Sequence, residues 1–318
     1  MLRIITCLDS QHDWRLVLLA AGVCLLTSLA ALNMYQRANA DDKDSSRLFW
    51  ALTAGLVSGC GVWATHFIGM LAYTPGIPVS FDFMMTVASL SIAIVMMSAG
   101  FVTATYGDRI WAPLIGGAIF GVATSLMHYV GIASLRMPAD IVWMPDLLTA
   151  SIVCGMGFSA LSFFIARRGE TLWHGGLSAG LLVVAILSDH LIAISAMGLI
   201  PDSTATSDSV GLSPFALSGG VASVMAAFVV ACLISAISDR RSRRDINERN
   251  MQLNAAIDNM MQGLCMFGPD NCLQLWNEKY VAMYKLAPED IRVGMTVDEM
   301  LAARKKAGTI VKDLDAYS

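Results

Sequence analysis

Three histidines stand at equal spacing in apolar sequence, and their side chains could bind a metal. His66, His128 and His190 are each separated by 62 residues. A set of methionines lies one to seven residues from them, namely Met70, Met127 and Met197. Imidazole nitrogens bind copper, zinc and iron, while thioether sulfur selects Cu(I). We therefore expect the three histidines to ligate a metal ion, with copper favoured, and the methionines to be further candidate ligands.

The spacing of the histidines belongs to a longer internal repeat. Other positions keep the same register, with Gly55 and Gly59 matching Gly117 and Gly121, and Gly69 matching Gly131. The third copy has drifted and carries Ala179 and Ala193 where the others have glycine. A constant period is the signature of a repeat architecture. Because glycines four apart let membrane helices approach closely, the two copies of this pair predict equivalent helix packing.

Composition indicates a membrane protein. The 318 residues are 56% hydrophobic and only 14% charged, with a mean hydropathy of +0.60, whereas soluble domains carry about a quarter charged residues. A helix crosses the hydrocarbon core with roughly 20 apolar residues. Seven stretches qualify: Leu16–Gln36, Leu48–Tyr73, Phe81–Tyr106, Trp111–Leu135, Leu147–Ala166, Gly175–Ile200 and Pro214–Ser238. The first is too long for the apolar region of a signal peptide.

The lysines and arginines predict how these helices are oriented. They gather in the connections after the first, third and fifth stretches and after the seventh, at Arg37, Lys43, Arg47, Arg109, Arg167, Arg168, Arg240, Arg241, Arg243 and Arg244. The positive-inside rule assigns these connections to the cytoplasm. The N-terminus is then periplasmic, the C-terminus is cytoplasmic, and the three histidines lie in the outer halves of the second, fourth and sixth helices.

Several classes of function are disfavoured by composition. The formal charge is −4 and the basic residues sit in short connections, so we expect no nucleic-acid partner. The seven cysteines are scattered without a C-x-x-C pair, which argues against a disulfide framework or a zinc knuckle. No constellation of a nucleophile with its base is visible, and no enzyme activity is assigned.

The character of the chain changes after the seventh helix. Residues 239–250 form a charged, basic juxtamembrane linker that we expect to be helical and to suit anionic headgroups. From residue 251 the sequence is mixed, with expected strands at Gly263–Phe267 and Leu273–Trp276 and expected helices at Asn277–Tyr284 and Val297–Lys306. The expected domains are therefore a membrane domain over 1–238, the linker, and a partial soluble domain over 251–318.

The run Met127-His128-Tyr129, with its two echoes, resembles the MHYT domain, a seven-helix bacterial membrane sensor. The motif differs here in having Val130 where the family has threonine, and the echoes are Thr65-His66-Phe67 and Asp189-His190-Leu191. The segment from Met251 is similar to the opening of a PAS domain. The resemblance implies an all-α protein of the bacterial inner membrane. Three two-helix repeats and a seventh transmembrane helix would be followed by a partial α+β PAS segment.

The resemblance also implies a function. The family has been proposed to bind copper, and through a copper ion with an open position it could sense O2, CO or NO. It is often linked through PAS domains to GGDEF and EAL domains of cyclic di-GMP signalling, and PAS-linked sensors generally act as homodimers. Because the chain has no GGDEF-type or EAL-type signature, we expect such an output from a partner.

Other interpretations of the histidines remain open. They could hydrogen-bond across helices, ligate haem in a membrane redox protein, or serve a proton- or ion-coupled transporter together with Asp189. Asp189 could orient His190 by accepting its N–H, or face water as a proton site. Trp63, Tyr129 and Trp143 are interpreted as aromatic residues of the membrane interface.

Overall fold

The computed structural model describes residues 13–41, 43–73, 79–107, 110–169, 171–201 and 211–309. The expectation for Arg109 and part of that for the outer loops fall outside these residues. The chain divides into two compact units, Met1–Leu233 and Ile234–Ser318. Each unit is described by itself.

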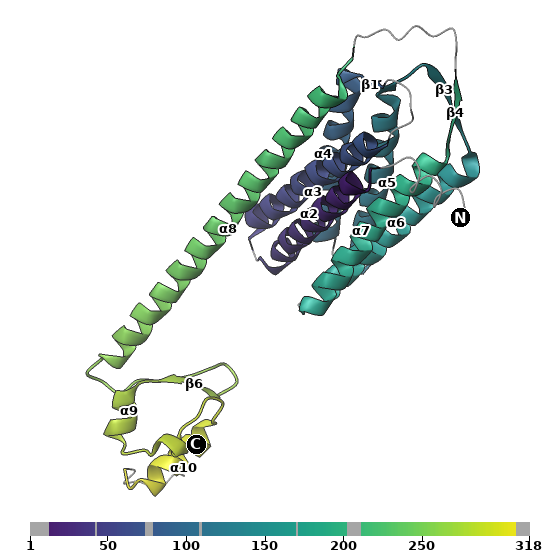
Figure 1. The fold of residues 1–318 in the computed structure, drawn as a ribbon. Coiled ribbons are helices and arrows are strands. Elements are labelled where there is room, and N and C mark those ends of the chain that lie inside the picture. Colours follow the sequence, from purple (N-terminus) through teal and green to yellow (C-terminus); the bar gives the residue numbers. More distant parts are fainter. Residues whose placement is uncertain are drawn as a thin grey trace. The chain divides into compact units, whose positions relative to one another are not determined.

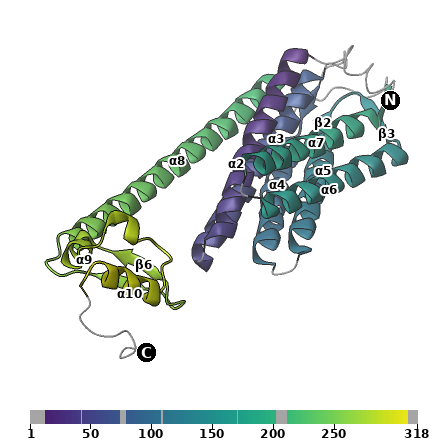
Figure 2. The same ribbon diagram turned by 90° about the horizontal axis from the view of Figure 1, so that it is seen from below.

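Long apolar helices make up most of the first unit (Figure 1, Figure 2). They are α2 (Trp14–Ala40), α3 (Asp44–Ala72), α4 (Phe83–Tyr106), α5 (Ala112–Ala133), α6 (Pro145–Arg168) and α7 (Leu172–Ser195). Within the described residues, these six are long and apolar enough to cross a membrane. The expected seventh span falls in α8 (Pro214–Asp258), whose described apolar part is Pro214–Val230. The chain is thus a mostly helical, multi-pass membrane protein.

The helices close into a ring in which alternate members lie inside. Each packs against its neighbours in sequence, α7 returns to α2, and α5 also touches α3 and α7. The most apolar windows of α3, α5 and α7 are 61%, 61% and 44% buried, against 33%, 33% and 28% for α2, α4 and α6. The three inner helices are the ones that carry the histidines. The predicted repeat of two helices therefore has one outer and one inner member.

Two glycine pairs fix how closely inner and outer helices approach. A Cβ added to Gly55 or Gly59 of α3 would lie 2.3 Å or 2.7 Å from backbone Cα atoms of α4. A Cβ added to Gly117 or Gly121 of α5 would lie 2.6 Å or 2.5 Å from Cα atoms of α6. Real Cβ atoms do not come so near, so only glycine allows these contacts. The expectation that the two pairs pack equivalently is confirmed.

Basic side chains meet at one end of the bundle. Arg47, at the start of α3, donates to the backbone carbonyl of Thr105 at 2.8 Å, and Arg167, near the end of α6, donates to the carbonyl of Ala104. Both carbonyls belong to the last turn of α4, where unpaired acceptors favour cationic donors. These two arginines therefore share one end of the bundle, as their assignment to a common side of the membrane requires.

Short strands at the opposite end were not expected. β1 (Ser80–Phe81) pairs antiparallel with β2 (Leu135–Arg136), and β3 (Ala139–Trp143) pairs antiparallel with β4 (Met197–Pro201). The predicted helix over Gly175–Ile200 is wrong at its end, because α7 stops at Ser195. The residues that follow pair instead with a run rich in β-branched and aromatic side chains, which favours strand.

The second unit contains the elements expected of its segment. They are β5 (Cys265–Phe267), β6 (Leu273–Trp276), α9 (Glu278–Met283), the short 3-10 helix η1 (Pro288–Asp290) and α10 (Val297–Lys306). The two strands pair antiparallel across the predicted turn, where Asn271 takes a left-handed conformation with φ of 56°. A small core joins the elements, built from Leu273, Tyr280, Leu286, Ile291, Met295 and Met300.

Candidate metal centre

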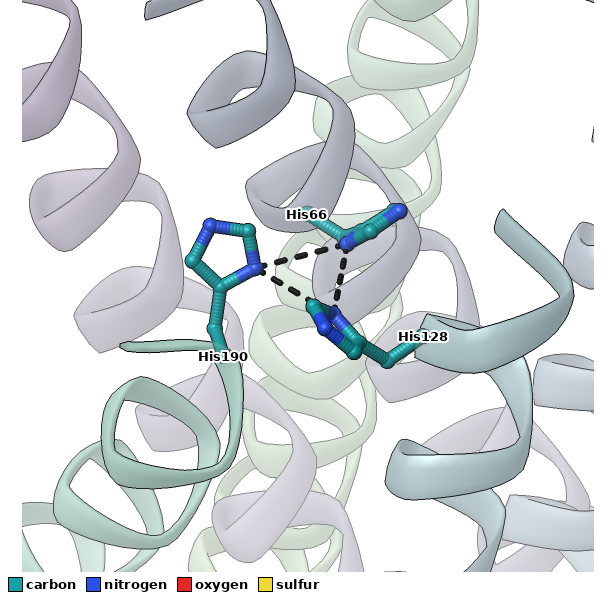
Figure 3. A group of neighbouring side chains, drawn as sticks. All are labelled: His66, His128 and His190. Atoms are coloured by element: carbon teal, nitrogen blue, oxygen red, sulfur yellow. Dashed lines mark hydrogen bonds between the residues drawn. The ribbon is translucent and has the colours of Figure 1, made fainter. Parts of the chain in front are cut away.

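The three equally spaced histidines meet in the middle of the bundle (Figure 3). The Nδ1 atoms of His66 and His128 are 2.9 Å apart, those of His66 and His190 are 3.4 Å apart, and those of His128 and His190 are 3.3 Å apart. A point equidistant from all three lies about 1.9 Å from each, close to the roughly 2.0–2.1 Å of a metal–imidazole bond. The triangle therefore has the dimensions of a three-nitrogen metal site.

The rings surround this point like three blades. Their planes make angles of 77°, 80° and 81° with one another. His66 and His128 are 3% and 1% exposed, and His190 is half-buried. Each ring comes from a different inner helix, so the repeat of 62 residues supplies one nitrogen from each copy.

The triangle cannot be satisfied by hydrogen bonds among the histidines alone. A neutral imidazole carries a proton on one nitrogen and a lone pair on the other. A bond between two Nδ1 atoms needs one protonated atom and one lone pair. Among three mutually adjacent atoms, two must be in the same state, and that pair repels. A cation at the centre would instead accept a lone pair from all three Nδ1 atoms.

The outward nitrogens of these rings face glycines. A Cβ added to Gly131 of α5 would lie 2.4 Å from Nε2 of His66, and one added to Gly69 of α3 would lie 2.6 Å from Nε2 of His190. Each of these two glycines lies three residues after a cluster histidine and makes room for the histidine of a different repeat. Nε2 of His66 and Nε2 of His128 are buried without a hydrogen-bond partner among the described residues.

A cavity of about 100 Å³ adjoins the cluster. Residues of α2, α3, α5 and α7 line it, and most of them are apolar. The lining residues are Val17, Ala20, Ala21, Val62, Thr65, His66, Gly69, Thr124, Met127, His128, Ile186, Leu187, Asp189, His190 and Leu191. Thr65 and Thr124 donate their hydroxyls to carbonyls of their own helices, at 2.8 Å and 3.0 Å. The cavity is thus a small, largely apolar space with the histidine cluster in its wall.

The three candidate methionines lie in different surroundings. Met127 is 1% exposed and lines the cavity beside the histidines. Met70 is buried in the core but does not line the cavity. Met197 was expected on the same helical face as His190, and this is wrong, because α7 has ended and Met197 pairs with Trp143 in the β3–β4 ladder. The methionine whose position suits the cluster is therefore Met127.

Asp189 lies next to the cluster and is completely buried. The Ser125 hydroxyl donates to its Oδ1 at 2.7 Å, while Oδ2 has no hydrogen-bond partner among the described residues. The Ser151 hydroxyl, which bonds with the Tyr129 hydroxyl at 2.6 Å, lies beside the same carboxyl group. The expectation that Asp189 orients His190 is thus replaced by an interaction with serine.

The aromatic residues near the cluster are structural. Trp63 is 4% exposed and its indole N–H donates to Ser89 Oγ at 3.1 Å, so its expected position at the membrane interface is wrong. Tyr129 and Trp143 pack edge to face with ring centroids 5.4 Å apart. The periodicity of the sequence gave no signal for these contacts, because they join segments outside the repeated motif.

Comparison with known proteins supports the repeat. The MHYT family, described as a bacterial signalling protein N terminal repeat, matches residues 59–117 and 121–179. The two matched stretches begin 62 residues apart and contain His66 and His128. The PAS fold matches residues 257–317. No solved structure matches the chain.

Two relatives match most of the chain. An uncharacterised signalling protein of Caulobacter vibrioides is 31% identical over 260 residues, which cover 81% of this chain and 32% of the relative. The cyclic di-GMP phosphodiesterase NbdA of Pseudomonas aeruginosa is 30% identical over 262 residues, which cover 77% of this chain and 32% of the relative.

A third relative matches a shorter part. The bifunctional diguanylate cyclase/cyclic di-GMP phosphodiesterase MucR of Pseudomonas aeruginosa is 32% identical over 169 residues, which cover 53% of this chain and 24% of that protein. The chain spans about a third or less of the length of these three relatives. Its repeated helices, its matched segments and its relatives agree, and the chain belongs to the MHYT signalling proteins, with two MHYT repeats followed by a PAS fold.

Proposed function

We propose that this protein is a membrane sensor that binds a copper ion at His66, His128 and His190. The observation that carries the proposal is the triangle of Nδ1 atoms, whose hydrogen bonds cannot all be made in the absence of a cation. Its dimensions suit metal–imidazole bonds. Copper is favoured because imidazole and thioether sulfur together suit it, and Met127 lines the same cavity.

The size of the cavity favours copper over the haem alternative. Cofactor and drug-sized ligands occupy pockets of roughly 300–1,000 Å³, whereas this cavity measures about 100 Å³. Two histidines that ligate one haem must also stand on opposite sides of the macrocycle, while these three converge on a single point. An ion with three protein ligands and an adjoining cavity keeps an open position, at which a diatomic gas such as O2, CO or NO would bind.

The signal would pass through α8 to the PAS segment. We propose seven spans with a periplasmic N-terminus and a cytoplasmic C-terminus in the bacterial inner membrane, which agrees with Arg47 and Arg167 meeting at one end of the bundle. The domain limits proposed from the sequence are 1–238, 239–250 and 251–318. The names of two relatives support a cyclic di-GMP output, supplied by a GGDEF/EAL partner, and the sensor would act as a homodimer. Ligand binding shifts the helices only if two states differ in affinity.

Metal analysis of the purified protein in nanodiscs tests the proposal. After copper reconstitution and removal of excess metal, we expect one copper ion per chain by mass spectrometry. The triple variant with His66, His128 and His190 changed to alanine should hold none. His174→Ala is the matched control, because His174 lies apart from the cluster and bonds with Thr171 at 2.5 Å. Copper retained by the triple variant, or absent from the unaltered protein, would contradict the proposal.

A further inference from the structure

One of the three equivalent seams in the ring lacks the glycines that close the other two. In the first and second repeats, Gly55 with Gly59 and Gly117 with Gly121 bring each inner helix onto the next outer helix. The equivalent positions of the third repeat are Ala179 and Val183 on α7. The next outer helix in the ring after α7 is α2. Because side chains now stand between the backbones, α7 and α2 cannot approach as α3 and α4 do.

The cavity lies at this loose seam. Val17, Ala20 and Ala21 line it from α2, and Ile186, Leu187 and Leu191 line it from α7. No residue of α4, α6 or the described part of α8 lines it. His190 is half-buried, whereas His66 and His128 are almost fully buried. The seam without glycines is therefore the side on which the histidine cluster is least enclosed.

We propose that the seam between α2 and α7 is a lateral entrance through which small uncharged molecules pass from the hydrocarbon of the bilayer to the histidine cluster. The inference rests on the proposed metal site and adds the route and the class of ligand. Aliphatic side chains form both walls of the seam, and four of them are half-buried: Val17, Ala21, Leu187 and Leu191. An ion would have to lose its hydration to pass between them, whereas an apolar molecule would not.

The size of the cavity limits what can enter. A volume of about 100 Å³ corresponds to roughly three times the 30 Å³ that one water molecule occupies in the liquid. Such a space accommodates a diatomic molecule and excludes a lipid headgroup. Ala21 is the smallest half-buried side chain of the lining on α2, so a larger side chain there should narrow the passage without touching a ligand histidine.

Carbon monoxide is a suitable probe, since it binds Cu(I) and can be released by a light pulse. The experiment uses the full chain in nanodiscs, loaded with Cu(I), and records the rate at which carbon monoxide added from solution binds. We expect Ala21→Leu to slow binding at least about tenfold, which corresponds to roughly 1.4 kcal/mol in the barrier. Leu187→Ala, which removes part of the opposite wall, should speed it.

Gly22→Leu is the matched control. It introduces the same side chain one residue further along α2, at an exposed position where a Cβ meets nothing within 4 Å. Its rate should stay within about twofold of the unaltered protein, because a change of 0.4 kcal/mol or less in the barrier gives no more. Copper content and the carbon monoxide vibrational band of each variant check that the site itself is intact.

The outcomes separate this inference from the proposed function. Unchanged rates in both Ala21→Leu and Leu187→Ala, with copper bound and carbon monoxide ligated, would overturn the lateral entrance and leave the metal site standing. Equal slowing by Gly22→Leu would overturn it as well, because the effect would not depend on the seam. Absence of copper from the unaltered protein would overturn both.

Discussion

Gly131 lies against the imidazole of His66, although the two residues belong to different repeats. A Cβ at Gly131 would lie 2.4 Å from Nε2 of His66, which is closer than real Cβ atoms come to any neighbour. The ring on α3 is thus held in place by the backbone of α5. Gly69 stands in the same relationship to His190. The glycines that follow the histidines in the repeat are therefore part of the site.

Gly131→Ala should displace His66 and weaken metal binding. The added methyl group must push the ring away from its position, and a shift of a few tenths of an ångström in one ligand breaks the matched distances of the triangle. We expect the dissociation constant for copper to rise at least about tenfold, a loss of roughly 1.4 kcal/mol. Competition with a chelator of known affinity measures it.

The control for this variant is Gly157→Ala on α6, where a Cβ would meet nothing within 4 Å. It should leave copper affinity unchanged, and the protein should gain up to about 1 kcal/mol of stability, because alanine favours helix over glycine. Equal copper affinities for Gly131→Ala and Gly157→Ala would show that the contact with His66 does not matter for the site.

Ser125 and Asp189 should behave as a coupled pair. Ser125→Ala leaves the buried Oδ1 of Asp189 without its donor at 2.7 Å, and an unsatisfied buried group of this kind costs about 1–3 kcal/mol. Replacing both partners by apolar residues of similar size, as in Ser125→Ala with Asp189→Leu, should cost less than the sum of the single changes. Thermal unfolding of the four proteins in one detergent measures the coupling, and strictly additive effects would exclude it.

Acidification should loosen the outer end of the bundle at Asp82. This carboxylate precedes α4, accepts the backbone N–H of Met85 at 3.0 Å and pairs with Arg136 at 2.5 Å. The Met85 N–H, followed by the Arg136 guanidinium, holds the pKa of Asp82 below its ordinary value. Because the folded-state pKa is depressed, the stabilisation is complete above the unfolded-state pKa of about 3.9 and is lost as pH falls through the folded-state value.

Hydrogen exchange of the first turn of α4 measures this effect. Protection should decrease in acid in the unaltered protein, and Asp82→Asn should already be less protected at neutral pH and respond little to acid. Arg136→Gln should keep part of the pH dependence, since the bond from Met85 remains. An acid response of the same size in Asp82→Asn would assign the titration to another group.

Asn277 should connect the end of α8 to the PAS segment. Its carboxamide oxygen accepts from the backbone N–H groups of Leu264 and Tyr280 at 2.8 Å and 3.0 Å, and its amide group donates to the carbonyls of Ile257 and Gln262 at 3.1 Å and 2.9 Å. The side chain is 1% exposed. Asn277→Ala removes all four bonds and should destabilise this unit by about 1–3 kcal/mol.

Asn277→Asp distinguishes the two halves of this arrangement. Aspartate can still accept the two N–H groups, but it cannot donate to the carbonyls of Ile257 and Gln262. It should therefore keep the start of α9 and lose protection at the end of α8 in hydrogen exchange. Asn259→Ala, which removes only one exposed bond to Ala255, should change neither region. Identical exchange in all three variants would remove Asn277 from the path of the signal.

The sequence predicted the helices and the histidines because both follow a simple period. Apolar runs set the helices to within a few residues at most of their ends, and the repeat of 62 residues brought His66, His128 and His190 to one depth on equivalent helices. The strands after α5 and α7 were not predictable, because an apolar run such as Met197–Pro201 suits helix or strand until its partner is known. Met197 was misassigned for the same reason.

The contacts of Asp189 also escaped prediction. Its partner Ser125 is 64 residues away on another helix, and their meeting depends on the rotation of α5 against α7 rather than on any local pattern. The cavity escaped for a related reason. Ala179 and Val183 in the third copy look like ordinary drift in the sequence, and their effect on helix separation appears only when the ring closes.

The order in which the repeats occur along the chain has a consequence for biogenesis. The three ligands are 62 residues apart on α3, α5 and α7, so a nascent chain that has inserted helices only as far as α5 holds two of the three imidazoles. The third arrives with α7, at the moment when the last inner helix closes against α2. An ion that needs all three nitrogens can therefore be loaded only into a chain whose ring is complete, and occupancy of the site reports finished membrane insertion.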